Sequence, residues 1–203
     1  QAVKWFKLAA DNGDSYAQNN LAYMYLNGTG VVKDYSEALK WYIESALQGD
    51  SLAQFNLGLL YRKGIGTRKD NVRVVKWYTA AAVQGLSSAQ NNLGVMYYQG
   101  SGVPQDYSEA IKWFREAVKK NDPFGQYNLG VMYEKGKGVV QDKREAVKWY
   151  TRASLPGDKE VDLFRGKIYE YDELYFHREQ DPFEWYTLGF GEEKNQFNLA
   201  EMY

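Results

Sequence analysis

The chain has 203 residues, of which 44% are hydrophobic, and this length allows one or two globular domains. Its 25 basic and 26 acidic residues give a net charge of −1, so the overall charge offers no attraction for nucleic acid or an anionic membrane. The absence of cysteine excludes disulfides, thiolate zinc sites and a cysteine nucleophile, and no stretch approaches the ~20 apolar residues of a membrane helix.

A repeat of 36 residues runs through most of the sequence. All six tryptophans follow this spacing, at Trp5, Trp41, Trp77, Trp113, Trp149 and Trp185. A leucine, a tyrosine and two glycines recur with the same period: Leu21, Leu57, Leu93 and Leu129; Tyr25, Tyr61, Tyr97 and Tyr133; Gly28, Gly64, Gly100 and Gly136; Gly30, Gly66, Gly102 and Gly138. Such a period indicates an array of units that bury their apolar faces by stacking.

The sequence starts inside a unit. Residues 1–13 match a second helix, because Ala2 and Trp5 stand where Ala38 and Trp41 stand one period later, and Gly13 ends the match. No first helix, capping aspartate or initiator methionine precedes it. We therefore expect a cut fragment or a processed chain, from which a signal peptide could have been lost.

Four full units follow, over residues 14–49, 50–85, 86–121 and 122–157, and each is predicted to form two helices joined by a glycine turn. In the third unit the first helix is expected over 88–99, with one apolar stripe made of Ala89, Leu93, Met96 and Tyr97. Gly94 at the edge of this stripe predicts close approach of a neighbouring helix, and Gly100 is expected to end the helix in the left-handed conformation.

The second helix of this unit is predicted to begin at Asp106, whose carboxylate caps the free amides, with Glu109 completing a capping box. The pair recurs as Asp34 with Glu37 and as Asp142 with Glu145, whereas the second unit has Asp70 with Arg73 and lacks the box. The buried face of the helix is expected to consist of Ala110, Trp113, Phe114 and Ala117.

The pattern A-x-x-N-L-G-x-x-Y-x-x-G-x-G-V-x-x-D-Y-x-x-A-x-x-W-[YF]-x-x-A resembles the Sel-one-like repeat, a relative of the tetratricopeptide repeat. Four stretches match it: Ala17–Gly49, Ala53–Gly85, Ala89–Asn121 and Gly125–Gly157. The resemblance implies an all-α fold, an α-α superhelix in which antiparallel helix pairs form a right-handed solenoid. It also implies a bacterial origin and a scaffolding or adaptor role, and we expect residues 1–203 to form one such domain.

Residues 158–203 depart from the pattern. Trp185 stays in register, but Arg165 replaces the core leucine, Asp172 and Leu174 replace the turn glycines, and Pro182 replaces the core alanine. We expect a degenerate unit that helps to cap the stack, followed by a final half unit over Gln196–Tyr203. The alternative is a partner-specific acidic and aromatic insert, Glu170–Phe183, with Tyr171, Tyr175 and Phe176 exposed.

The sequence offers little support for catalysis. His177 is the single histidine, so a histidine-based metal site and a Ser-His-Asp arrangement lack residues. The Gly28-Thr29-Gly30 turn and its copies lack the lysine and the preceding strand of a phosphate-binding loop. We therefore predict a protein that is not an enzyme and uses neither a cofactor nor a metal.

The predicted binding surface is the face of each first helix opposite its buried stripe. By similarity to tetratricopeptide arrays, this face would line the concave side of the solenoid. Because an exposed helix face is ordinarily polar, the aromatic and apolar residues on it favour a partner groove, although a tightly curled stack could instead bury them. The candidate residues are Asn19, Tyr23, Leu26, Phe55, Leu59, Arg62, Asn91, Val95, Tyr98, Tyr127, Val131 and Glu134.

Asparagines also recur just before the core leucine, at Asn20, Asn56, Asn92 and Asn128, each two residues after a glutamine. This ladder could hydrogen-bond the backbone of a bound peptide, or it could bond a neighbouring helix inside the stack. The second role is favoured because the ladder persists where the other groove positions differ.

These observations predict a non-enzymatic scaffold that binds a peptide or a protein, without nucleic acid and without membrane insertion. One alternative is the regulatory or substrate-recruiting arm of a larger enzyme, and another is a glycan or peptidoglycan module that stacks sugars on tyrosines. The resemblance implies adaptors of the envelope, secreted host-interaction factors or immunity proteins, and it favours a periplasmic or secreted location over a cytoplasmic one.

Overall fold

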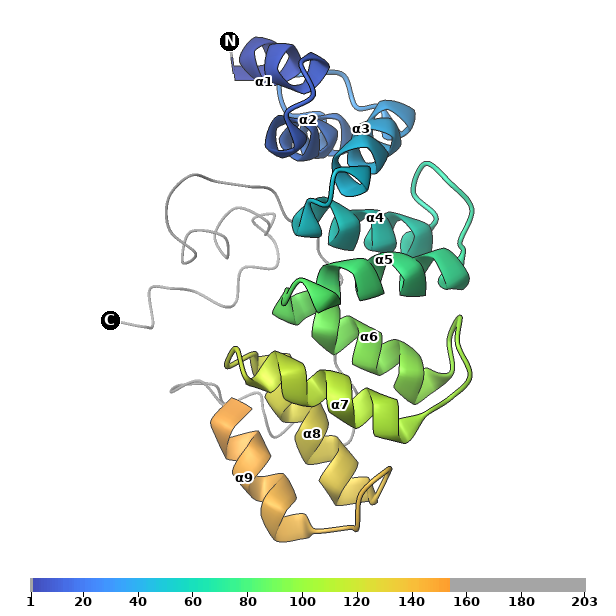
Figure 1. The fold of residues 1–203 in the computed structure, drawn as a ribbon, viewed down its shortest axis with the longest axis vertical. Helices are drawn as coiled ribbons and strands as arrows, with labels where there is room; N and C mark the ends of the chain where they lie inside the picture. Colours follow the sequence, from blue (N-terminus) through green and yellow to red (C-terminus); the bar gives the residue numbers. More distant parts are fainter. Residues whose placement is uncertain (1, 154–203) are drawn as a thin grey trace, which may run out of the picture. The chain divides into compact units, whose positions relative to one another are not determined.

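The structure, a computed structural model, describes residues 2–153, and every predicted feature of residues 158–203 lies outside this range. The described residues form nine helices and no strand (Figure 1). Their bounds are α1 Ala2–Asp11, α2 Ser15–Asn27, α3 Tyr35–Leu47, α4 Ser51–Lys63, α5 Asn71–Val83, α6 Ser87–Gln99, α7 Tyr107–Val118, α8 Pro123–Lys135 and α9 Lys143–Ala153.

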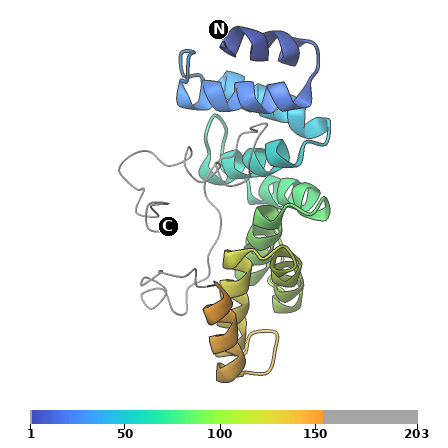
Figure 2. The same ribbon diagram turned by 90° about the vertical axis from the view of Figure 1, so that its left-hand side faces the viewer.

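The described residues divide into two compact units, one that ends at Ala81 and one that begins at Ala82, so the boundary falls within α5. Within the first, α2 packs against α1 and α3, and α3 packs against α4. Within the second, α7 packs against α6 and α8, and α8 packs against α9, and both views show these helices side by side (Figures 1 and 2). The predicted all-α class of paired helices is therefore confirmed. That all 203 residues form one domain remains a prediction.

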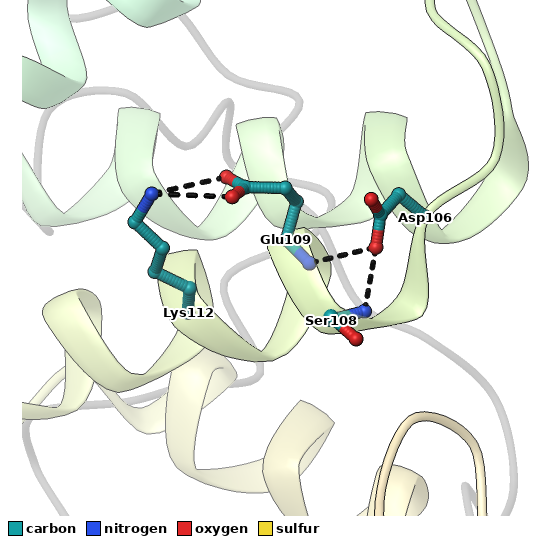
Figure 3. Close-up of polar contacts among 4 residues, drawn as sticks. All are labelled: Asp106, Ser108, Glu109 and Lys112. Atoms are coloured by element: carbon teal, nitrogen blue, oxygen red, sulfur yellow. Dashed lines mark hydrogen bonds and ion pairs between the residues drawn. The ribbon is translucent and has the colours of Figure 1, made fainter.

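The predicted helix starts and ends are present. Asp106 Oδ1 accepts hydrogen bonds from the backbone amides of Ser108 and Glu109, at 2.8 and 3.0 Å (Figure 3). Gly100 ends α6 with φ of 68°, and Gly102 follows with φ of 76°. Because a side chain is strained at such positive φ values, glycine is required where the chain turns back toward the second helix.

The predicted capping box does not form, so this prediction is wrong. The amide of Asp106 donates to the carbonyl of Tyr97 at 3.0 Å, so it is not available to Glu109. The carboxylate of Glu109 instead pairs with Lys112, with Oε1 at 3.2 Å from Nζ (Figure 3). In the first repeat Glu37 Oε2 likewise turns away and accepts from Trp41 Nε1 at 3.0 Å. Only the aspartate half of the predicted device forms.

The core between the two helices of a repeat depends on their close approach at a glycine. A Cβ added to Gly94 would lie 2.6 Å from Cε1 of Phe114, which confirms the packing reason predicted for that glycine. Phe114 is fully buried, as are Ala110 and Ala117. Trp113 is only half-buried, so its predicted place in the buried face is partly wrong: the residue beside it on α7 fills the core.

Candidate partner-binding surface

Most of the surface that the sequence predicts for partner binding is buried in the structure. The prediction of exposure is wrong for eight of the twelve candidates, each at most 6% exposed: Asn19, Leu26, Phe55, Leu59, Asn91, Val95, Tyr127 and Val131. The remaining four, Tyr23, Arg62, Tyr98 and Glu134, are half-buried. Whether any of the twelve binds a partner stays a prediction.

The buried aromatic candidates pack on the second helix of their own repeat. The ring of Phe55 stacks on that of Tyr78, with centroids 5.4 Å apart and planes at 23°. Tyr127 packs against Tyr150 with centroids 4.9 Å apart. The side of the first helix opposite the predicted stripe therefore faces protein rather than solvent, which is the physical reason for the correction.

Helix α4 is the clearest example of this burial. Its residues from Leu52 to Tyr61 are all buried, on every side of the helix. A helix that is apolar all round is a buried helix, and Leu52, Phe55 and Leu59 complete the apolar circumference of α4. That sequence signal was available and pointed to a central helix rather than to a groove.

The asparagine ladder is also internal. Asn56 Nδ2 donates to Asn19 Oδ1 at 3.1 Å, and Asn128 Nδ2 donates to Asn91 Oδ1 at 2.7 Å. Each bond joins the first helices of two successive repeats. Asn20, Asn56, Asn92 and Asn128 are at most 3% exposed, so the observed bonds agree with a role inside the stack.

The glutamines beside the ladder bond helix ends. The Nε2 atoms of Gln18, Gln54 and Gln90 donate to the carbonyls of Ala10, Ala46 and Ala82, at 3.0 to 3.1 Å. Each acceptor lies in the last turns of the second helix of the preceding repeat, where backbone carbonyls lack partners within the helix. A buried side-chain donor at this place ties each repeat to the one before it.

Three of the four half-buried candidates lie at the C-terminal ends of the first helices, and Tyr23 lies further inside α2. Arg62 is in the last turn of α4, and Tyr98 and Glu134 are each two residues before a turn glycine. Tyr98 packs on Tyr107 with centroids 5.4 Å apart, and the carbonyl of Tyr98 accepts from Gln105 Nε2 at 2.8 Å. The surface at this end of a repeat thus includes the turn, which lies outside the helix faces that sequence periodicity reveals.

Glu134 is held by its own repeat. The hydroxyl of Tyr150 donates to Glu134 Oε2 at 2.7 Å, which fixes the carboxylate at the end of α8. Beyond the turn, Lys137 Nζ lies 5.0 Å from the ring centroid of Tyr107, the same ring that packs on Tyr98. An aromatic pair, an ammonium group and an ordered carboxylate therefore occur close to the turns of the second compact unit, a mixture that suits recognition of peptide groups.

Among the described titratable groups, Tyr42 has the pKa that its surroundings shift most clearly. Burial raises the pKa of its phenol well above the usual value of 10.0, and the nearby Tyr23 raises it further. Among the described residues no hydrogen-bond partner meets the Tyr42 hydroxyl. A neutral phenol in this setting contributes to packing in the first unit.

Within residues 2–153 no cluster of three or more acidic or histidine side chains is arranged to hold a metal ion. None of the helices in that range has the length and apolar character needed to cross a bilayer.

Antiparallel helix pairs, a 36-residue period and paired turn glycines define the class of helical repeat proteins. The Sel1 repeat family matches five consecutive segments of this chain: residues 1–14, 15–50, 51–86, 87–122 and 123–158. The chain belongs to the Sel1 repeat family. Proteins of this family are generally non-enzymatic scaffolds for protein interactions.

Solved structures agree with this assignment. A protective antigen of uropathogenic Escherichia coli with an SLR fold is 39% identical, with a TM-score of 0.75, over 78% of this chain and 34% of the antigen. A Sel1 repeat protein of Oxalobacter formigenes is also 39% identical, with a TM-score of 0.70, over 75% of this chain and 63% of that protein. The chain thus spans about a third of the length of the antigen and under two thirds of the length of the Oxalobacter formigenes protein. Among curated proteins there is no match.

Proposed function

We propose that this chain is a protein-interaction scaffold that binds a peptide or protein partner at the C-terminal ends of its first helices and at the adjoining glycine turns. The observation that carries the proposal is the difference in exposure between neighbouring turns of a first helix. Val95 is fully buried, whereas Tyr98, one turn further along the same helix, is half-open. A partner that reaches α6 from solvent therefore meets Tyr98 and the turn beyond it.

The proposed surface is best defined between α6 and α8. The hydrogen bond between Asn91 and Asn128 ties these two helices together. Tyr98 and Glu134 each follow their bonded asparagine by about two helical turns, so they lie at the same end of the helix pair. A tyrosine anchor beside a fixed carboxylate suits a partner with an apolar side chain next to a basic or amide group.

The family supports the general role, since Sel1 repeat proteins bind proteins. The Escherichia coli protein is a protective antigen about three times as long as the part that matches this chain. Our proposal concerns the repeat surface alone.

The test uses partner capture with matched variants. The full chain, the double variant Tyr98→Ala/Glu134→Ala and the control Gln99→Ala/Lys135→Ala are immobilised and exposed to a lysate of the source cells. The control changes the adjacent, exposed residues on the same two helices. Retained proteins are quantified by mass spectrometry, and each protein that differs is purified for affinity measurement.

We expect a protein that the native chain and the control retain and that the double variant loses, with its Kd weakened at least about tenfold because truncation of an anchor residue typically has that effect. Circular dichroism must show equal helix content in all three. Equal retention by the double variant and the control would contradict the proposal.

A further inference from the structure

The second repeat carries a concentration of positive charge. Between positions 62 and 76, six of the 15 residues are basic and one, Asp70, is acidic. We call the basic residues the basic edge: Arg62, Lys63, Arg68, Lys69, Arg73 and Lys76. Arg62 is half-buried and the other five are exposed, along the last turn of α4, the turn and the first two turns of α5.

The other repeats neutralise the corresponding positions and this one does not. Glu37, Glu109 and Glu145 each pair with a lysine three residues on, at 2.8 to 3.9 Å. In the second repeat the glutamate position is Arg73, so Lys76 lacks this partner. Lys76 Nζ lies instead 5.3 Å from the ring centroid of Trp77.

The single carboxylate of the edge is already occupied. Asp70 Oδ2 lies 3.2 Å from Arg73 Nε, and Arg73 also donates to the hydroxyl of Tyr61 at 3.1 Å. Within the described part of the chain, no carboxylate pairs with Arg68, Lys69 or Lys76. These three exposed cations are therefore available to an acidic ligand.

The same chain contains a stretch of opposite charge. Positions 170–184, with the sequence EYDELYFHREQDPFE, include six acidic residues and one arginine in 15 positions, the inverse of the composition of the basic edge. This stretch lies outside the described residues. Because it is covalently joined to the repeats, its effective concentration at their surface is high even when each ion pair is weak.

We propose that the basic edge of the second repeat is a docking surface for the acidic stretch 170–184 of the same chain. The charges of the two stretches are equal in number and opposite in sign, and no described carboxylate pairs with Arg68, Lys69 or Lys76. The tyrosines and the phenylalanines of the stretch add apolar groups that suit the arginine side chains. The inference is independent of the partner surface proposed at Tyr98 and Glu134.

The absence of native cysteine makes a distance measurement direct. Cysteines introduced as Val72→Cys and Tyr175→Cys in the full chain carry spin labels, and the distance between the labels is measured by double electron–electron resonance. Val72 is an exposed, uncharged residue within the edge. The matched control replaces Val72→Cys with Ser108→Cys, the exposed residue at the same position of the next repeat.

We expect a short-distance population for the labels at positions 72 and 175 that the control pair lacks. Charge reversal by Arg68→Glu/Lys69→Glu should reduce this population roughly tenfold, because two attractive pairs become repulsive. Adding Asp172→Lys/Glu173→Lys should restore it, and 1 M NaCl should remove it because the Debye length falls to about 3 Å.

Three results would overturn the docking. One is the same distance distribution in the native and reversed chains. Another is an equally short distance for the control pair. The third is a short distance that grows with protein concentration, which would assign the contact to a second copy. Equal helix content and melting of all variants keep loss of folding from imitating loss of docking.

Discussion

Replacement of Phe55 by alanine separates a core residue from a binding residue. The side chain is fully buried and stacks on Tyr78 at 5.4 Å. Truncation of a buried phenylalanine costs about 3–5 kcal/mol, a range that includes the cavity, and the lost ring contact favours its upper half. We therefore expect the free energy of unfolding to fall by about 4 kcal/mol, which for a chain of this size lowers Tm by roughly 8–16 °C.

The assay is urea unfolding followed by both far-ultraviolet circular dichroism and tryptophan fluorescence. Both probes are needed because repeat arrays do not always unfold in one step. The control is Arg62→Ala on the same helix, a half-buried residue for which we expect a loss below about 1 kcal/mol. A loss below about 1 kcal/mol for Phe55→Ala, together with native-like melting, would refute the closed first helix and reinstate Phe55 as a surface residue.

Three further predictions test the interior with the same unfolding assay. Asn128→Leu should cost about 1–3 kcal/mol because it removes the buried hydrogen bond donated to Asn91 Oδ1, and the double leucine variant at positions 91 and 128 should recover part of this loss; no recovery would contradict pairwise coupling. Gly94→Ala should lower stability by about 1–2 kcal/mol despite its better helix propensity, because the new Cβ meets Phe114 at 2.6 Å, and a more stable variant would show that α6 and α7 can separate. Because burial raises the pKa of Tyr42, the folded state keeps a proton that the unfolded chain loses near pH 10.0, so stability should decline above that pH, and Tyr42→Phe should flatten the decline; an unchanged profile would contradict it.

The helices and their order could be predicted from the sequence because the residues that start and end each helix act on their immediate neighbours in the chain. Asp106 caps through its own neighbouring amides, and Gly100 adopts a positive φ that depends on the turn alone. The capping box failed because the amide of Asp106 bonds a carbonyl of the preceding helix, a contact between elements that spacing within one helix does not reveal.

The candidate surface was harder to predict for the same kind of reason. Opposite sides of one helix follow from its sequence, but which neighbours surround the helix depends on the packing of whole repeats. Val131 and Glu134 stand one turn apart on α8, yet the first is fully buried and the second is half-open. The apolar circumference of α4 was the usable signal, whereas the open ends near the turns required the packed structure.

The most direct test of the account measures thiol reactivity at two positions on one helix. The variants Val95→Cys and Tyr98→Cys each place the only cysteine of the chain on α6, one turn apart, and labelling by a soluble thiol reagent is followed under native conditions. We expect Cys at the Tyr98 position to react within about tenfold of its rate in urea, and Cys at the Val95 position to react at least about a hundredfold more slowly than in urea, because labelling there requires local opening. Equal rates at the two positions in the folded chain would contradict a scaffold in which α6 is closed at Val95 and accessible at Tyr98.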